Sequence, residues 1–482
     1  MTIDQAELAP LRPLSSDNLC CINIAIAFNK LARPLGHLGK DGHMIGRLVL
    51  LTSAVIVTLA SCIAVSNPST NHESNGPVSL TNAAVGDGGV PSFYVWTNPV
   101  PDKPGTVLRL QALEEHLALQ NSDPAKDLRI LYTSTDGVDG KTPVTVSGAI
   151  YLPIGNPPSG GWPIIAWDHG TVGVADICAQ SFRPRSPRDQ AYLEVLLSRG
   201  YAVVATDYEG LGTPGPHPYM ALRAEAYSTL DSVRAALATL PGVLANKVIA
   251  VGQSQGSGAA IATLQYAPAY APDINVLGGV ATGITDLFSG VNNASQIPPR
   301  AVAAGNSVYR ILRLIGLAPA VEPGFDATPY VSDLALPLLR ASTKACVDEL
   351  HTIQASSSVT NANYLKAQLP VNLQKKMDAV MSMPIEGFAL KAPLFTGTGL
   401  ADTTTPPSKA YNFISTACSR GATIEWHYYP GLTHSGTVNG SLPDSLPFIN
   451  KVFAGTPVTG NCSVLTIPPP LQAPTPGLPF NR

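Results

Sequence analysis

The chain of 482 residues carries few charges, and neither sign dominates. Asp, Glu, Lys and Arg together make up 13% of it, and the formal net charge is −3. Such a chain offers no basic surface to a polyanion, so we expect no nucleic-acid partner. The apolar content of 45% argues against disorder, because disordered chains combine high charge with low hydrophobicity. No repeat at a fixed period is present, so the composition is that of a large globular protein.

The sequence also lacks the ligand spacing of a zinc site. It has no Cys-x-x-Cys pair and no cluster of histidines, and we expect neither a metal nor another cofactor. Beyond Cys62, an even number of cysteines remains: Cys178, Cys346, Cys418 and Cys462. In an oxidising compartment these favour two disulfides, and their spacing leaves all three pairings open.

An apolar run near the amino terminus indicates export. Arg47 precedes the uncharged stretch "LVLLTSAVIVTLA" at 48–60, as in a secretory signal. The residues up to Cys62, "LASC", look like the lipobox of bacterial lipoproteins, in which this cysteine is acylated. A cleaved signal and an anchor helix are the alternatives, since the run reaches Val65 and approaches the roughly 17–25 residues of a membrane span. Each interpretation predicts a secreted or envelope-anchored domain, attached to a membrane through its N-terminus in two of the three.

Apolar runs and helical stretches alternate after a Ser/Asn/Gly-rich linker. Helices are predicted at 190–200, 227–240 and 257–267. Strands are predicted at 144–153, 201–210, 247–252 and 275–283, and a strand followed by a loop is predicted at each of 163–170, 391–402 and 423–434. This alternation predicts an α/β protein with a mostly parallel, doubly wound sheet.

The pattern changes between residues 285 and 385, where helical apolar clusters occur without buried strands. We therefore predict a helical insertion in the sheet domain. The expected parts are a leader at 1–61, a linker at 62–91, a first core part at 92–284, the insertion at 285–385, and a second core part with a Pro-rich tail at 386–482. If Met44 is the true start, the leader includes an upstream extension.

One pentapeptide suggests a catalytic serine. Gly252-Gln253-Ser254-Gln255-Gly256 fits the pattern G-x-S-x-G, which also occurs by chance in ordinary turns. Here it lies between a predicted apolar strand and a predicted helix, the context that a nucleophile elbow requires. Glycines on both sides allow the strand and helix to approach closely. These features favour Ser254 as a nucleophile.

A serine nucleophile needs a base and a carboxylate that orients it, in the chain order Ser, Asp or Glu, His. Asp402 and His434 each follow a predicted late strand, so they are the expected acid and base. Asp286 is a rival acid because it follows the preceding strand. The remaining acidic and histidine candidates fit less well, because they precede Ser254 in the chain or lie in the insertion or within a strand: Asp207, His72, His217, His351 and His427.

The oxyanion of an acyl-transfer intermediate needs backbone N–H donors. The residue after the nucleophile, Gln255, is expected to supply one. The other is expected from Gly170 or Thr171 in "DHGT", whose His169 we interpret as a residue that shapes this loop.

Together, "WDHGTVGVADICAQS", "YAVVATDYEGLGTPGPHPY", "GQSQGSGAA", "GLADTTTPPSKAYNF" and "GLTHSG" resemble the secretory lipase family of α/β-hydrolases. The resemblance implies the α/β-hydrolase fold, hydrolysis of lipid esters such as triacylglycerols, and a triad of Ser254, Asp402 and His434. It also implies that the insertion is a lid, and that the disulfides are Cys178–Cys346 and Cys418–Cys462. Gln253 and Asp168 depart from the usual family pattern.

Two other functions share these features: a peptidase or acyltransferase with the same triad, and a catalytically silent binding protein. Within the insertion, we hypothesise that residues 300–340 line an acyl tunnel or contact lipid. The alternative is that their apolar residues pack as core: Ile311, Leu312, Leu314, Ile315 and Leu317. No feature of the sequence bears on the oligomeric state.

Overall fold

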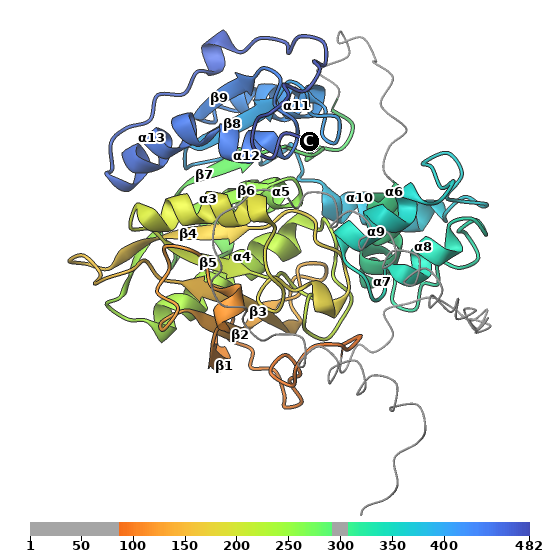
Figure 1. The fold of residues 1–482 in the computed structure, drawn as a ribbon, viewed down its shortest axis with the longest axis horizontal. Helices are drawn as coiled ribbons and strands as arrows, with labels where there is room; N and C mark the ends of the chain where they lie inside the picture. The colour runs from red at the N-terminus through yellow and green to blue at the C-terminus, as the bar shows by residue number, and fades with distance from the viewer. Residues whose placement is uncertain (1–85, 292–306) are drawn as a thin grey trace, which may run out of the picture. The chain divides into compact units, whose positions relative to one another are not determined.

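The computed structural model describes residues 86–291 and 307–482, so the leader and Cys62 lie outside the described residues. One nine-stranded sheet has the order β1-β2-β3-β5-β4-β6-β7-β8-β9 (Figure 1). Its strands are β1 (Val107–Ala112), β2 (Leu128–Thr135), β3 (Pro143–Tyr151), β4 (Trp162–Asp168), β5 (Ala202–Thr206), β6 (Leu244–Gln253), β7 (Val276–Thr282), β8 (Leu394–Gly399) and β9 (Ile424–Tyr429). From β4 to β9 the strands run parallel, and β1, β2 and β3 are antiparallel. The predicted mostly parallel sheet is confirmed.

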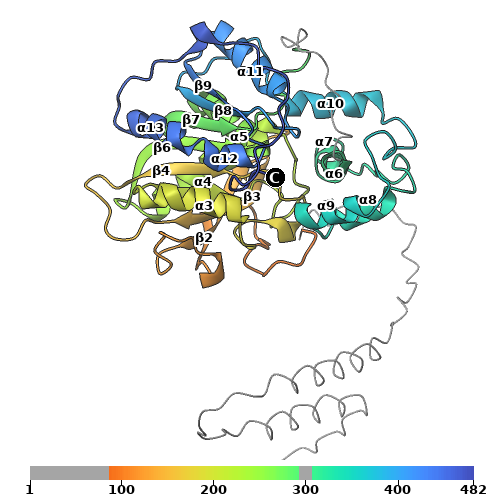
Figure 2. The same ribbon diagram turned by 45° about the horizontal axis from the view of Figure 1, so that its top comes forward.

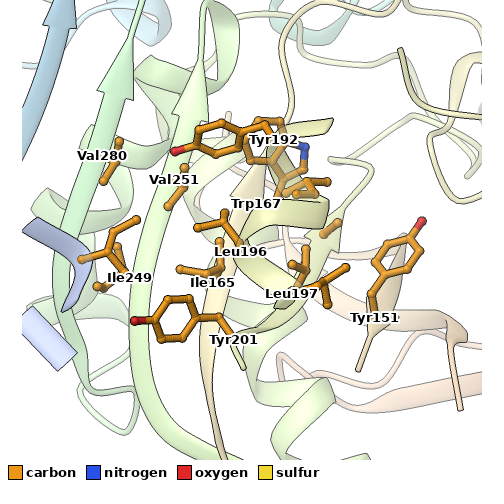
Figure 3. Packing of buried hydrophobic residues seen from close by; sticks show 14 of the residues in the cluster. Tyr151, Ile165, Trp167, Tyr192, Leu196, Leu197, Tyr201, Ile249, Val251 and Val280 are labelled. Atoms are coloured by element: carbon orange, nitrogen blue, oxygen red, sulfur yellow. The ribbon is translucent and has the colours of Figure 1, made fainter. Parts of the chain in front are cut away.

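Helices cover both faces of the sheet because successive strand residues point to opposite sides. In β4, Ile165 and Trp167 belong to one buried cluster, whereas Ile164 and Ala166 belong to another. The first cluster includes side chains of α3 (Pro187–Ser198) and α13 (Leu442–Phe453), and Figure 3 shows Leu196 of α3 beside Ile165 of β4 and Val251 of β6. The opposite face is covered by α4 (Leu222–Thr239), α5 (Gln255–Tyr270) and α11 (Pro407–Ser419).

The helices between β7 and β8 gather beside the sheet in both views (Figures 1 and 2). They are α6 (Ser307–Leu312), the π-helical η4 (Arg313–Leu317), α7 (Ala318–Val321), α8 (Leu336–Ala341), α9 (Val347–Ala355) and α10 (Val371–Met381). Residues of these helices share an apolar cluster with Val174, Tyr219 and Met220, which precede α3 and α4. We refer to residues 307–381 as the helical insertion.

Two disulfides cross-link the described chain. Cys178 is bonded to Cys346, which joins the loop after β4 to the residue before α9 of the insertion. Cys418 at the end of α11 is bonded to Cys462 in the tail. Within 86–291 and 307–482, no helix has the length and apolar character needed to cross a membrane.

Candidate active site

Ser254 lies on a strained turn between β6 and α5. Its backbone has φ 60° and ψ −120°, a region that L-residues rarely adopt outside functional sites. A Cβ at Gly252 would overlap the carbonyl oxygen of Gly256, and one at Gly256 would overlap that of Asp168. Both glycines are therefore required for the close approach of strand and helix. The resulting sharp turn places Ser254 at the carboxyl end of β6.

Asp402 and His434 are brought together by the loops after β8 and β9. His434 Nδ1 lies 2.7 Å from Asp402 Oδ2. The Asp402 carboxylate is 1% exposed and also accepts hydrogen bonds from the backbone N–H groups of Thr404 and Thr405, both at 2.8 Å, and from the Thr405 hydroxyl. These donors compensate for the water that the buried carboxylate has lost. The carboxylate is thereby fixed in one orientation against the imidazole.

Because a carboxylate only accepts hydrogen bonds, His434 donates from Nδ1, and the Nε2 of the neutral ring is left as an acceptor. This is the tautomer that a general base requires. Gly283 after β7 makes room for the ring, since a Cβ there would lie 2.6 Å from His434 Cε1. Its φ of 62° also favours glycine.

The rival acid and histidines have other partners, although His351 lines the same cavity as Ser254 and His434. Asp286 is 62% exposed at its side chain and forms an ion pair with Lys409 at 2.9 Å. His427 in β9 faces Glu425 and Asp444. Asp207 is buried and accepts hydrogen bonds from Ser147 and Ser181. His351 stacks edge-on against Tyr309 in the insertion, and His72 lies outside the described residues.

The loop after β4 passes close to the serine. A Cβ at Gly170 would lie 2.6 Å from Gln253 Oε1 and 3.6 Å from Ser254 Cβ, so this backbone approaches as closely as glycine permits. The Thr171 hydroxyl is 2.7 Å from that of Tyr219. His169 is buried against Tyr208, with ring centroids 4.4 Å apart. These contacts fit the predicted loop-shaping role of His169.

Behind the elbow lies a buried polar network that the sequence did not reveal. Gln255 Nε2 lies 3.0 Å from His217 Nε2 and donates to Glu225 Oε1 at 2.8 Å. His217 Nδ1 is 2.8 Å from the Glu209 carbonyl oxygen. Burial lowers the pKa of His217 to about 3 and raises the pKa of Glu225 well above its usual range. The His217 ring is therefore neutral near pH 7.

Ser254 and His434 line one cavity of about 490 Å³, together with Gly170, Thr171 and Gln253. Within 307–340, the part of the hypothesised acyl-tunnel segment that the structure describes, Tyr309 alone lines this cavity. The apolar residues singled out there, Ile311, Leu312, Leu314, Ile315 and Leu317, are at most 3% exposed. They pack inside the insertion or against the residues before α4, so the core interpretation holds for them.

A family model described as secretory lipase matches residues 187–461, more than half of the chain. The chain belongs to the secretory lipase family. It is 25% identical over 291 residues to lipase A of Moesziomyces aphidis, covering 54% of this chain and 56% of that protein. It is 23% identical over 287 residues to a secreted triacylglycerol lipase of Malassezia restricta, covering 57% and 58%. The chain thus spans little more than half the length of these relatives.

Among solved structures, lipase A from Candida antarctica in its closed state superposes with a TM-score of 0.57. The match covers 80% of this chain and 91% of that structure at 17% identity, a level that shows the fold alone. The predicted α/β-hydrolase fold is confirmed.

Proposed function

We propose that the chain is an exported serine hydrolase of carboxylic esters, in which Ser254, His434 and Asp402 form the catalytic triad. The observation that carries the proposal is the 2.7 Å contact of His434 with Asp402 beside the strained Ser254, at one cavity. Secretory lipase membership and the relatives named as lipases support lipid esters as the substrate class. Export agrees with the same family and relatives; acylation of Cys62 stays a prediction.

In the proposed reaction, His434 Nε2 takes the Ser254 hydroxyl proton as Oγ attacks the ester carbonyl carbon. The carbonyl π electrons move to oxygen, and the backbone N–H of Gln255, with that of Gly170 or Thr171, donates to this oxyanion. The oxyanion collapses, the C–O bond to the alcohol breaks, and His434 returns the proton to the leaving alkoxide. Water, deprotonated by His434, then attacks the acyl-enzyme, and the acid leaves as Ser254 recovers its proton.

Ser254→Ala tests this assignment. The variant is expected to retain the melting temperature of the wild type and to lose cleavage of p-nitrophenyl esters and labelling by a fluorophosphonate probe. Ser257→Ala is a matched control, because Ser257 lies one helical turn away and bonds to the Ser254 carbonyl. Cleavage by Ser254→Ala above a few per cent of wild type would refute the proposal. Parallel assays with a peptide and with an alcohol acceptor separate the hydrolase from a peptidase or acyltransferase with the same triad.

A further inference from the structure

The cavity that contains Ser254 is lined by charged side chains as well as apolar ones. Four arginines contribute to its wall: Arg183, Arg185, Arg188 and Arg482. Two of them have acidic partners, since Arg183 pairs with Glu349 and Arg188 with Asp189, each at 2.8 Å. Sites for purely apolar ligands are mostly lined by apolar side chains with few polar groups. A wall of this kind indicates a ligand with a polar or charged part.

Arg185 differs from the other three arginines of this wall because it is buried. It is 4% exposed, and none of its three guanidinium nitrogens has a hydrogen-bond partner among the described residues. Its Cζ lies 5.6 Å from the centroid of the Tyr151 ring, a cation–π contact. Tyr151 is itself buried; burial raises the pKa of its hydroxyl, and the neighbouring guanidinium of Arg185 opposes this rise.

The charge of Arg185 calls for an anion. A guanidinium is always protonated in proteins, and burying its charge without a hydrogen-bonded counter-ion is strongly unfavourable. Asp207 and Asp189 are both buried here, but Asp207 accepts hydrogen bonds from Ser147 and from the backbone and hydroxyl of Ser181, and Asp189 pairs with Arg188. Within the described parts of the chain, no ion pair joins either carboxylate to Arg185. Tyr151 is a neutral neighbour, whose pKa burial raises, and it supplies no counter-charge.

We propose that Arg185 binds an anionic oxygen group of the substrate, a carboxylate or a phosphate, at the cavity that holds Ser254. The inference rests on the proposed ester hydrolysis and specifies its substrate class: an ester that carries a second, charged group. The planar guanidinium matches both groups with two parallel hydrogen bonds. Because its nitrogens are closed off from solvent, Arg185 must shift toward the cavity when the anion binds.

The first test compares two p-nitrophenyl esters of similar length, the monoester of glutaric acid and the hexanoate. The measured quantity is kcat/KM for the glutarate monoester divided by kcat/KM for the hexanoate. We expect this ratio to be about tenfold or more lower in Arg185→Gln than in wild type, which is the loss expected for a charged hydrogen bond. Arg185→Lys, which keeps the charge without the planar fork, should lose part of this ratio. Arg183→Gln, a matched control at the same cavity, should keep the ratio within about twofold of wild type. An equal ratio in Arg185→Gln and wild type overturns the proposal.

A second test does not depend on catalysis. Binding of free glutarate and of inorganic phosphate is measured by calorimetry on full-length Ser254→Ala, with and without Arg185→Gln. We expect binding in the first protein and its loss in the second, and the stronger of the two ligands identifies the anion. Equal binding by both proteins, or no binding by either, refutes the anion site. If no ester is cleaved and Ser254 is not labelled, the hydrolase proposal fails, while these binding data still decide the role of Arg185.

Discussion

Gln255 Nε2 lies 3.0 Å from His217 Nε2, and both side chains are buried. The His217 ring donates from Nδ1 to a carbonyl oxygen, so its Nε2 accepts from Gln255. Gln255 directly follows the candidate nucleophile, and its backbone N–H is the predicted first donor of the oxyanion hole. The network thus holds in place the residue whose N–H must not move during catalysis.

Gln255→Met should therefore impair catalysis, because the backbone N–H of residue 255 is no longer held in place. It removes both side-chain hydrogen bonds, which leaves His217 Nε2 without its donor and Glu225 Oε1 with only the Met220 N–H, at a cost of about 1–3 kcal/mol of stability. We expect kcat on a p-nitrophenyl ester to fall about tenfold with KM nearly unchanged, because an oxyanion donor acts in the transition state. Gln265→Met, farther along the same helix, is the control and should keep kcat. A lower melting temperature with unchanged kcat in Gln255→Met would mean that the network is only structural.

The elbow and the candidate triad were predictable because each residue directly follows a recognisable strand. β6, β8 and β9 are apolar enough to be identified locally, and Ser254, Asp402 and His434 stand at or just beyond their carboxyl ends. β1 and β2 were missed. β1 lies at the edge with half of its residues exposed, and β2 carries Arg129, which breaks its apolar run. That arginine is tolerated only because Glu114 and the Ser181 carbonyl bind it from distant segments.

Other features depend on contacts between distant segments, so no local pattern signals them. Gly283 is required by the ring of His434, which lies far along the chain. Asn481 in the tail accepts a hydrogen bond from the Thr433 backbone at 2.7 Å, beside His434. The isolation of Arg185 is likewise visible only when its neighbours are placed around it. The sequence therefore predicts the candidate reacting groups but not the groups that position or surround them.

Asp402→Asn should lower kcat by roughly 10²–10⁴-fold. The amide can donate to His434 Nδ1 and so favour the wrong tautomer of the ring, as in other serine hydrolases with a triad. Thr405→Val should have a smaller effect, about tenfold or less, since it removes one of the hydrogen bonds to the carboxylate. Steady-state kinetics on a p-nitrophenyl ester measure both changes. Full activity in Asp402→Asn would remove this residue from the triad.

Leu317 should matter for stability more than for the choice of acyl chain. It is 0% exposed and packs with Ala221 and Ala224 at the start of α4. Leu317→Ala is expected to cost about 2–5 kcal/mol of unfolding free energy. The control Leu334→Ala removes a side chain that is 58% exposed and should change stability by about 0.5 kcal/mol or less. If Leu317→Ala instead lowers kcat/KM for long-chain esters selectively, the acyl-tunnel hypothesis regains support.

Asp87 and Asp176 are in reciprocal contact, and this contact is expected to make stability depend on pH. The Asp87 backbone N–H donates to Asp176 Oδ2 at 2.7 Å, and the Asp176 N–H lies 3.0 Å from Asp87 Oδ1. Burial, followed by the neighbouring carboxyl group of Asp176, raises the pKa of Asp87 to about 8. Between about pH 4 and pH 8, the folded protein therefore keeps the Asp87 carboxyl group protonated. In the unfolded chain the pKa of this group is near 3.9, so it releases the proton there.

Below about pH 4, the protonated Asp87 carboxyl makes its full contribution to the free energy of unfolding. This contribution is lost as the pH rises to about 8, because only the folded state binds the proton between these pH values. Asp87→Asn imitates the protonated carboxyl group and should remove this decrease in stability with rising pH. We expect the variant to melt a few degrees above wild type at pH 9, while the two converge at pH 4. Asp102→Asn, at an exposed position, is the control and should follow wild type at both pH values. A constant difference between Asp87→Asn and wild type across this range would show that the carboxyl pair does not share a proton.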